Sequence, residues 1–170
     1  MRYTLRLAIT IVVALGPAAA HAQTDAANPP APHQQILSTN PLGLLANWFN
    51  GEYERKIGPA TTVGIAASTW DAVDYKGGSL FLRWYPQGEA LAGFYVGARA
   101  GAYHFEMYPR GKSALPGVGL EVGHNWLFGP HRNASVGIGF GVTRLFRNSG
   151  DGDGPIILPN VRLVNFGIAF

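Results

Sequence analysis

Apolar and polar side chains alternate along much of this chain, most clearly in its last ten residues, VRLVNFGIAF. One parity is apolar, and the other is small or polar. Successive side chains of a β-strand point to opposite faces, so this pattern predicts a strand with one apolar face. The apolar set is Val164, Phe166, Ile168 and Phe170.

Seven further segments upstream have a strand-like pattern and are separated by turn signals rich in Gly, Pro and polar residues. Most of the eight are roughly as long as a tilted strand must be to cross a membrane. They predict an all-β, eight-stranded antiparallel up-and-down transmembrane β-barrel. The predicted strands are 36–44, 49–57, 61–70, 79–85, 94–105, 115–128, 134–145 and 156–170.

The connections between these strands also alternate. Those at 58–60, 86–93 and 129–133 are short or moderate, whereas those at 71–78, 106–114 and 146–155 are polar and mostly longer. Bacterial outer-membrane barrels have short periplasmic turns and longer external loops, with an even number of strands. The short link LANW, between the first two predicted strands, departs from this alternation.

The two parities differ most over 136–143. One parity there is large and apolar, and the other is Gly137, Gly139, Gly141 and Thr143. A face exposed to water would be rich in Lys, Glu, Ser and Thr, whereas glycine suits the crowded lumen of a narrow barrel. The apolar face is therefore expected to meet lipid, and a soluble barrel with an apolar interior is the alternative fold.

The first 22 residues have the pattern of a secretory signal peptide. Arg2 and Arg6 precede an apolar run over 7–15, and small residues at Ala20 and Ala22 mark a cleavage site. The apolar run is too short for a membrane helix. The expected organisation is a signal peptide at 1–22, a flexible periplasmic leader at 23–35 and the barrel at 36–170.

The composition supports a membrane barrel and excludes some other classes. Only 14% of residues are charged, 23 are Gly, and 12% are aromatic. Without Arg2 and Arg6 the mature chain keeps 11 basic against 10 acidic residues, and it has no basic patch, so nucleic acid is not an expected partner. The chain has no Cys, which excludes a lipidated cysteine and a disulfide framework.

Two longer stretches of the sequence resemble a known family of proteins. STNPLGLLANWFNGEYERKI, followed by FYVGARAGAYHF, resembles a family of small bacterial outer-membrane β-barrels of undefined function. The resemblance covers most of residues 36–170 and implies no catalytic residues. The terminal Phe170, with its alternating apolar residues, also resembles the signal that directs outer-membrane proteins to the barrel-assembly machinery.

Several charged residues fall on the Gly-rich, lumen-facing parity of their strands. Because an isolated buried charge is costly, they are expected to pair and to plug the lumen. The alternative is a path for protons or ions through a narrow pore. The predicted network is Glu52, Glu54, Arg83, Arg99 and Glu121, accompanied by Asn125 and Asn165.

The sequence offers little support for a catalytic site or a metal site. A lipid-modifying barrel such as a lipid A deacylase needs a Ser and a His held close together, and the nearest candidates here are His131 and Ser135, across a turn. The motif DGDG at 151–154 begins like a Ca²⁺ loop, but Arg162 stands where that loop has its final Glu. We expect no catalytic residue, cofactor or metal.

The sequence thus predicts an integral protein of the bacterial outer membrane with a structural or surface-interaction role. Its expected partners are outer-membrane lipids, lipopolysaccharide and the barrel-assembly machinery. A lipid-modifying enzyme and a narrow pore are the two alternatives.

Overall fold

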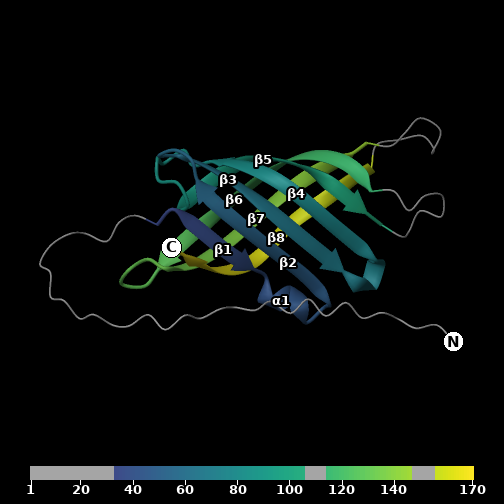
Figure 1. Ribbon diagram of the computed structural model, residues 1–170, viewed down its shortest axis with the longest axis horizontal. Coiled ribbons are helices and arrows are strands. Elements are labelled where there is room, and N and C mark those ends of the chain that lie inside the picture. The colour runs from purple at the N-terminus through teal and green to yellow at the C-terminus, as the bar shows by residue number, and fades with distance from the viewer. Residues whose placement is uncertain (1–32, 106–113, 147–155) are drawn as a thin grey trace, which may run out of the picture. The chain divides into compact units, whose positions relative to one another are not determined.

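A computed structural model describes residues 33–105, 114–146 and 156–170. The predicted signal peptide, most of the leader and the longer parts of two loops lie outside these residues. The described chain forms one closed barrel of eight antiparallel strands (Figure 1). The strands are β1 (Gln35–Thr39), β2 (Trp48–Lys56), β3 (Thr61–Trp70), β4 (Tyr75–Trp84), β5 (Gly93–His104), β6 (Leu115–Phe128), β7 (Ala134–Leu145) and β8 (Ile156–Ala169).

The strands follow one another in sequence order around the barrel, and β1 pairs with β8 to close it. The predicted all-β, eight-stranded antiparallel architecture is therefore confirmed. The only helices among the described residues are α1 (Pro41–Leu44) and a 3₁₀ turn, η1 (Asp71–Val73). None of the helices in the described ranges is both long and apolar enough to cross a membrane.

Two predicted strand boundaries were wrong. β1 ends at Thr39, because Asn40 caps α1 by accepting a hydrogen bond from the Gly43 backbone N–H at 3.1 Å. Asn at the cap and Pro at the first helical position both favour a helix start. β4 begins at Tyr75 rather than at 79, so part of the predicted polar loop is strand.

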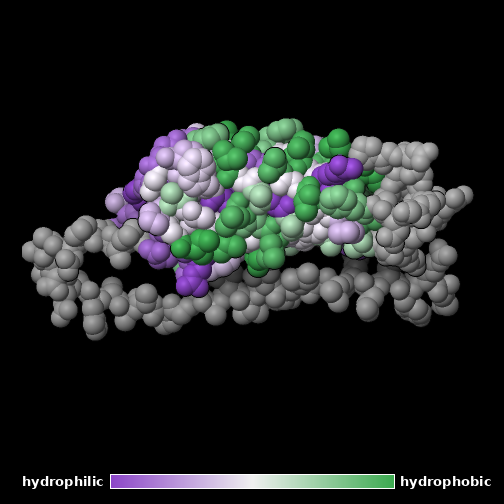
Figure 2. All heavy atoms as spheres, turned by 90° about the horizontal axis from the view of Figure 1, so that it is seen from above, coloured by the Kyte–Doolittle hydropathy of each residue, from purple (hydrophilic) through white to green (hydrophobic). Residues whose placement is uncertain are grey.

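The outer face of the barrel is apolar, and the inner face is glycine-rich and polar, as the alternation predicts. In β6 the outward residue Leu120 is 67% exposed, whereas its neighbour Glu121 is 5% exposed. In Figure 2 hydrophobic residues cover the middle of the visible face, and hydrophilic residues gather at its left end.

Lumen glycines are more tightly packed than the sequence indicates. A Cβ added to Gly139 would lie 2.5 Å from the phenol oxygen of Tyr95, which real Cβ atoms essentially never approach. Even a small side chain at this position would therefore require the Tyr95 phenol to shift. Gly139 lets the Tyr95 ring fill the lumen.

A β-bulge interrupts the pairing of β7 with β8. Gly137 is opposite Asn165, but Gly139 is opposite Arg162, so β8 has one residue more than β7 in this interval. An extra residue reverses the parity of the strand beyond it. Arg162 consequently faces the lumen, and Leu163 is 53% exposed on the outside.

The barrel end that holds the chain's C-terminus and the turns at 57–60, 85–92 and 129–133 is called here the terminal end. The connection from β4 to β5 folds inward there, and the Ala90 backbone N–H donates to the Pro59 carbonyl at 2.8 Å. Leu91 is buried against Ile36 and Ala169. This apolar cluster closes the terminal end of the lumen.

The opposite end, called here the loop end, holds α1, η1, the last residues of β5 and β7 and the first residues of β6 and β8. β1 is much shorter than its neighbours, so it does not reach this end. Over 156–165 no described strand pairs with the edge of β8 that faces away from β7. The helix α1 packs against β2 and β8 in this region.

Candidate functional site

The candidate site is a group of buried charges in the middle of the lumen, and Arg83 of β4 is at its centre. Its guanidinium is fully buried and contacts three carboxylates from two strands. Nε lies 2.6 Å from Glu121, Nη1 lies 2.6 Å from Glu54, and Nη2 lies 3.1 Å from Glu52. All three nitrogens of the planar guanidinium therefore have an acidic partner.

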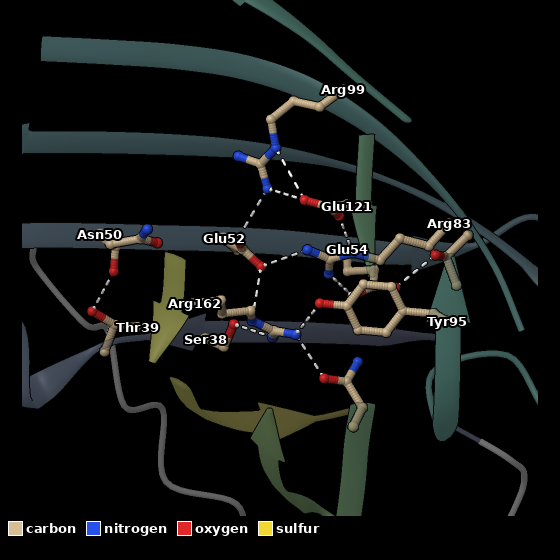
Figure 3. A network of polar contacts seen from close by, with 12 residues as sticks. Ser38, Thr39, Asn50, Glu52, Glu54, Arg83, Tyr95, Arg99, Glu121 and Arg162 are labelled. Carbon is tan, nitrogen blue, oxygen red and sulfur yellow. Dashed lines mark hydrogen bonds and ion pairs between the residues drawn. The ribbon is translucent and has the colours of Figure 1, made fainter. Parts of the chain in front are cut away.

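Glu52 of β2 is shared by three arginines. Besides Arg83, Arg99 Nη2 lies 3.4 Å from Glu52 Oε1, and Arg162 Nε lies 3.3 Å from Glu52 Oε2. Figure 3 shows these side chains converging from strands far apart in the sequence. Arg99 also binds Glu121 at 2.7 Å and donates to the Ser79 hydroxyl at 3.1 Å.

We call these six residues the charge network: Glu52, Glu54, Arg83, Arg99, Glu121 and Arg162. Three acids and three bases make its formal charge zero. Breaking one buried ion pair leaves the other charge unpaired in a poorly solvated site, which destabilises a protein strongly. The network therefore fixes the relative positions of β2, β4, β5, β6 and β8.

Neutral side chains complete the network towards the terminal end. Glu54 Oε1 accepts hydrogen bonds from the Thr62 hydroxyl at 2.6 Å and from the Tyr85 phenol at 2.7 Å. Asn125 links the two ends of this chain of contacts. Its Nδ2 donates to the Tyr85 oxygen at 2.9 Å, and its Oδ1 accepts from Arg162 Nη1 at 2.7 Å.

Aromatic rings enclose the central guanidinium. Arg83 Cζ lies 4.0 Å from the centre of the Phe81 ring and 4.5 Å from that of Tyr95. Rings stacked on a guanidinium stabilise its charge through their π faces. Every carboxylate of the network is therefore paired with at least one arginine, and two rings cover the central guanidinium.

The structure brings together all five charged residues that the sequence places in the lumen: Glu52, Glu54, Arg83, Arg99 and Glu121. Asn125 joins them, while Asn165 is buried without a hydrogen-bond partner among the described residues. The sequence analysis missed Arg162, because strict alternation through β8 places it on the outer face. Only the bulge turns it inward.

The residues considered for a lipid-modifying enzyme or a Ca²⁺ site are not part of the charge network. Ser135 is buried in β7, and His131 is exposed in the turn that precedes this strand. No hydrogen bond joins them. Within the described ranges, no cluster of three or more His, Cys, Asp or Glu side chains could hold a metal ion. The DGDG motif falls outside the described residues.

The four residues of the expected assembly signal lie at the end of β8 and the C-terminus. Phe166, Ile168 and Phe170 are exposed on the outer face, and Val164 is half-buried beside the bulge. The Phe170 backbone also contributes to closure, because its carbonyl accepts hydrogen bonds from the N–H groups of Gln34 and Gln35, both at 2.9 Å.

Neither a family model, nor a curated protein, nor a solved structure matches this chain.

Proposed function

We propose that this protein is an integral β-barrel of the bacterial outer membrane, whose role is structural or interactive rather than catalytic. The observation that carries the proposal is the apolar outer face. Every strand has at least one exposed large apolar side chain. One from each strand, in chain order, is Leu37, Phe49, Ile65, Leu80, Val96, Leu120, Phe140 and Ile168.

The contrast between the two faces supports lipid rather than water as the surrounding medium. Leu80, Leu120 and Ile168 are each more than 60% exposed, while every charge of the network is at least 91% buried. Soluble monomers rarely expose continuous apolar patches of more than a few hundred Å². Membrane barrels have this inverted arrangement, with apolar residues outside and polar residues inside.

The distribution of aromatic side chains supports the same proposal. Large aromatic residues gather on the outer face near the terminal end. Membrane barrels have girdles of aromatic residues where the hydrocarbon meets the headgroups. The terminal end would then be the periplasmic end, with its hydrophilic turns in water. The exposed aromatic residues there are Trp84, Phe94, Trp126, Phe128 and Phe170.

The closed lumen favours a structural or interactive role over a pore. The charge network fills the middle of the barrel, and Leu91 closes the terminal end. On this proposal, the loop end offers the contacts, and outer-membrane lipids and lipopolysaccharide surround the barrel. Export through a cleaved signal peptide and insertion by the barrel-assembly machinery belong to the same proposal, as does membership of the family of small outer-membrane barrels.

The test is quenching of tryptophan fluorescence by brominated phospholipids. The full chain has four tryptophans, of which Trp84 and Trp126 lie on the outer face. Two single-tryptophan variants would retain either Trp84 or Trp126 and carry Phe at the other three positions. Refolded into vesicles, both should be quenched by brominated acyl chains, with depths that place both indoles near one interface.

The matched control is the same pair of variants with lipids brominated only in the headgroup region. The proposal fails if the protein stays soluble and folded in buffer without detergent and brominated acyl chains quench neither indole. That outcome would instead support a soluble barrel.

A further inference from the structure

The half of the lumen above the charge network, towards the loop end, is a cavity of about 420 Å³. This volume lies within the range typical of small-molecule sites. Arg99 and Ser79 contribute to its floor. The cavity is separate from the apolar cluster that closes the terminal end, and the proposed structural role does not use it.

Aromatic rings form much of the cavity wall: Trp48, Trp70, Tyr75, Tyr103 and Phe105. The rings of Trp48 and Trp70 are stacked with their centres 5.9 Å apart, and those of Tyr75 and Phe105 lie 5.0 Å apart. Both indole N–H groups are already used, by the Ser68 hydroxyl at 2.9 Å and the Ala46 carbonyl at 3.2 Å. The two indoles therefore offer apolar surface to a ligand.

Two polar atoms on the lining residues have no partner. The side-chain oxygen of Asn50 and the phenol oxygen of Tyr103 are buried without a hydrogen bond to any described residue. Asn50 is 7% exposed and Tyr103 is 4% exposed. Buried polar groups are normally hydrogen-bonded, and leaving one unpaired is costly. An amide oxygen that accepts and a phenol that donates suit one hydroxyl group, which can do both.

The electrostatics at the floor disfavour a charged ligand. Arg99 already binds Glu121, Glu52 and Ser79, and the network as a whole has no formal charge. Among the described residues that line the cavity, a carboxylate or phosphate would find no free cationic partner, and an ammonium would find no free carboxylate, although either would be desolvated. The site therefore suits an uncharged molecule.

We propose that the loop-end cavity binds a small uncharged molecule with an aromatic or aliphatic body and one hydroxyl group. The body packs against the indole and phenol rings. The Asn50 and Tyr103 side chains, whose oxygens are shielded in the unliganded barrel, shift towards the ligand, so that its hydroxyl donates to Asn50 Oδ1 and accepts from the Tyr103 phenol. Binding supplies the missing partners of both atoms and does not disturb the charge network. The proposal holds for the barrel in lipid, detergent or buffer, so it does not depend on the membrane location.

Fluorine NMR of the full chain labelled with 5-fluorotryptophan tests this proposal, with 2-naphthalenemethanol as the probe. The four tryptophans give four signals, assigned by Trp→Phe substitution. The signals of Trp48 and Trp70 should shift and saturate. Those of Trp84 and Trp126, on the outer face, should not follow the same saturation curve, because they report only on probe dissolved in the detergent.

Two analogues of the probe have the same ring system. The anion 2-naphthoate should bind at least about tenfold more weakly than the alcohol, because its charge has no partner in the cavity. The hydrocarbon 2-methylnaphthalene should lose about fivefold in affinity, since it leaves both polar atoms unpaired.

Tyr103→Phe should lower the affinity for the alcohol by about fivefold and leave the affinity for the hydrocarbon unchanged, because it removes only the phenol oxygen. Tyr53→Phe is the matched control, since its phenol is outside the cavity and donates to Gln35. If Tyr103→Phe does not fold, Asn50→Ala replaces it and should show the same selective loss. Unsaturable shifts shared by all four tryptophans, no shift at Trp48 and Trp70, or equal binding of the anion would each overturn the proposal.

Discussion

Glu52 and Arg162 form an ion pair across the lumen, with 3.3 Å between Oε2 and Nε, although they come from the second and the last strand. Arg162 reaches Glu52 only because β8 bulges. This contact connects β8 to the centre of the charge network. The first prediction tests how much the contact stabilises the barrel.

Arg162→Met should lower the free energy of unfolding by about 3–5 kcal/mol, because it leaves the buried network with three carboxylates and only two guanidiniums. Adding Glu52→Gln should recover part of this loss. Urea unfolding of both single variants and the double variant gives the coupling energy. The control is Lys76→Met, which removes an exposed ion pair 3.7 Å long and should cost less than about 1 kcal/mol. Zero coupling between Glu52 and Arg162 would mean that water reaches each group separately.

A second prediction concerns crowding in the lumen. Gly139→Ala should destabilise the barrel by about 1–3 kcal/mol, because its Cβ would overlap the Tyr95 phenol oxygen. Tyr95→Phe removes that oxygen and should restore part of the stability in the double variant. Gly78→Ala is the control, since its Cβ would meet nothing within 4 Å. Equal effects of the two Gly→Ala changes would argue against a packed lumen.

A third prediction distinguishes lipid from water outside the barrel. Leu120→Arg should destabilise the protein in vesicles by about 2–4 kcal/mol if the residue lies near the bilayer midplane. Leu45→Arg, in the turn after α1, serves as the comparison and should have little effect, since Leu45 is 87% exposed at the loop end. A barrel that gains solubility and keeps its stability with Leu120→Arg would be a soluble one.

Conductance provides a fourth prediction. Purified protein in planar bilayers should show no steady single-channel current, because Arg83 is fully buried among three carboxylates and Leu91 blocks the terminal end. Leu91→Gly should not open a conducting path by itself, since the charge network remains. Discrete, ion-selective current steps from the unmodified protein would revive the pore alternative.

The fifth prediction tests the assembly signal. Phe170→Asp should lower the amount of heat-modifiable protein in the outer membrane and raise periplasmic degradation. A substitution is preferable to a deletion, because the Phe170 backbone also holds Gln34 and Gln35. Ser38→Asp, at an inward position, shows whether any added acid has the same effect. If Phe170→Asp left the amount of protein in the outer membrane unchanged, the Phe170 side chain would not be part of the assembly signal.

Alternation alone was enough to predict the barrel and most of its interior. Arg83 and Glu121 are flanked by outward apolar residues, so their parity indicated the lumen correctly. The same reasoning failed at Arg162, because a bulge depends on the pairing between two strands and not on one strand's pattern. It also ran the first strand through residues 41–44, where the Asn40–Pro41 pair starts a helix.

The sequence could not predict the interior features that depend on how several strands are placed relative to one another. Burial of Leu91 follows from how the connection from β4 to β5 folds back over Pro59. The unpaired oxygens of Asn50 and Tyr103 become visible only when β2 and β5 are placed around the same cavity. Sequence spacing contains no information about either.

The short first strand has a consequence for how the ring of strands opens and closes. Only four residue pairs join β1 to β8, from Ile36–Ala169 to Thr39–Phe166, whereas twelve join β6 to β7. Amide hydrogen exchange should therefore be fastest along this seam, where local separation breaks the fewest bonds. When this seam is open, the edge of β8 that faces β1 has no partner and is free to pair with a strand from another chain.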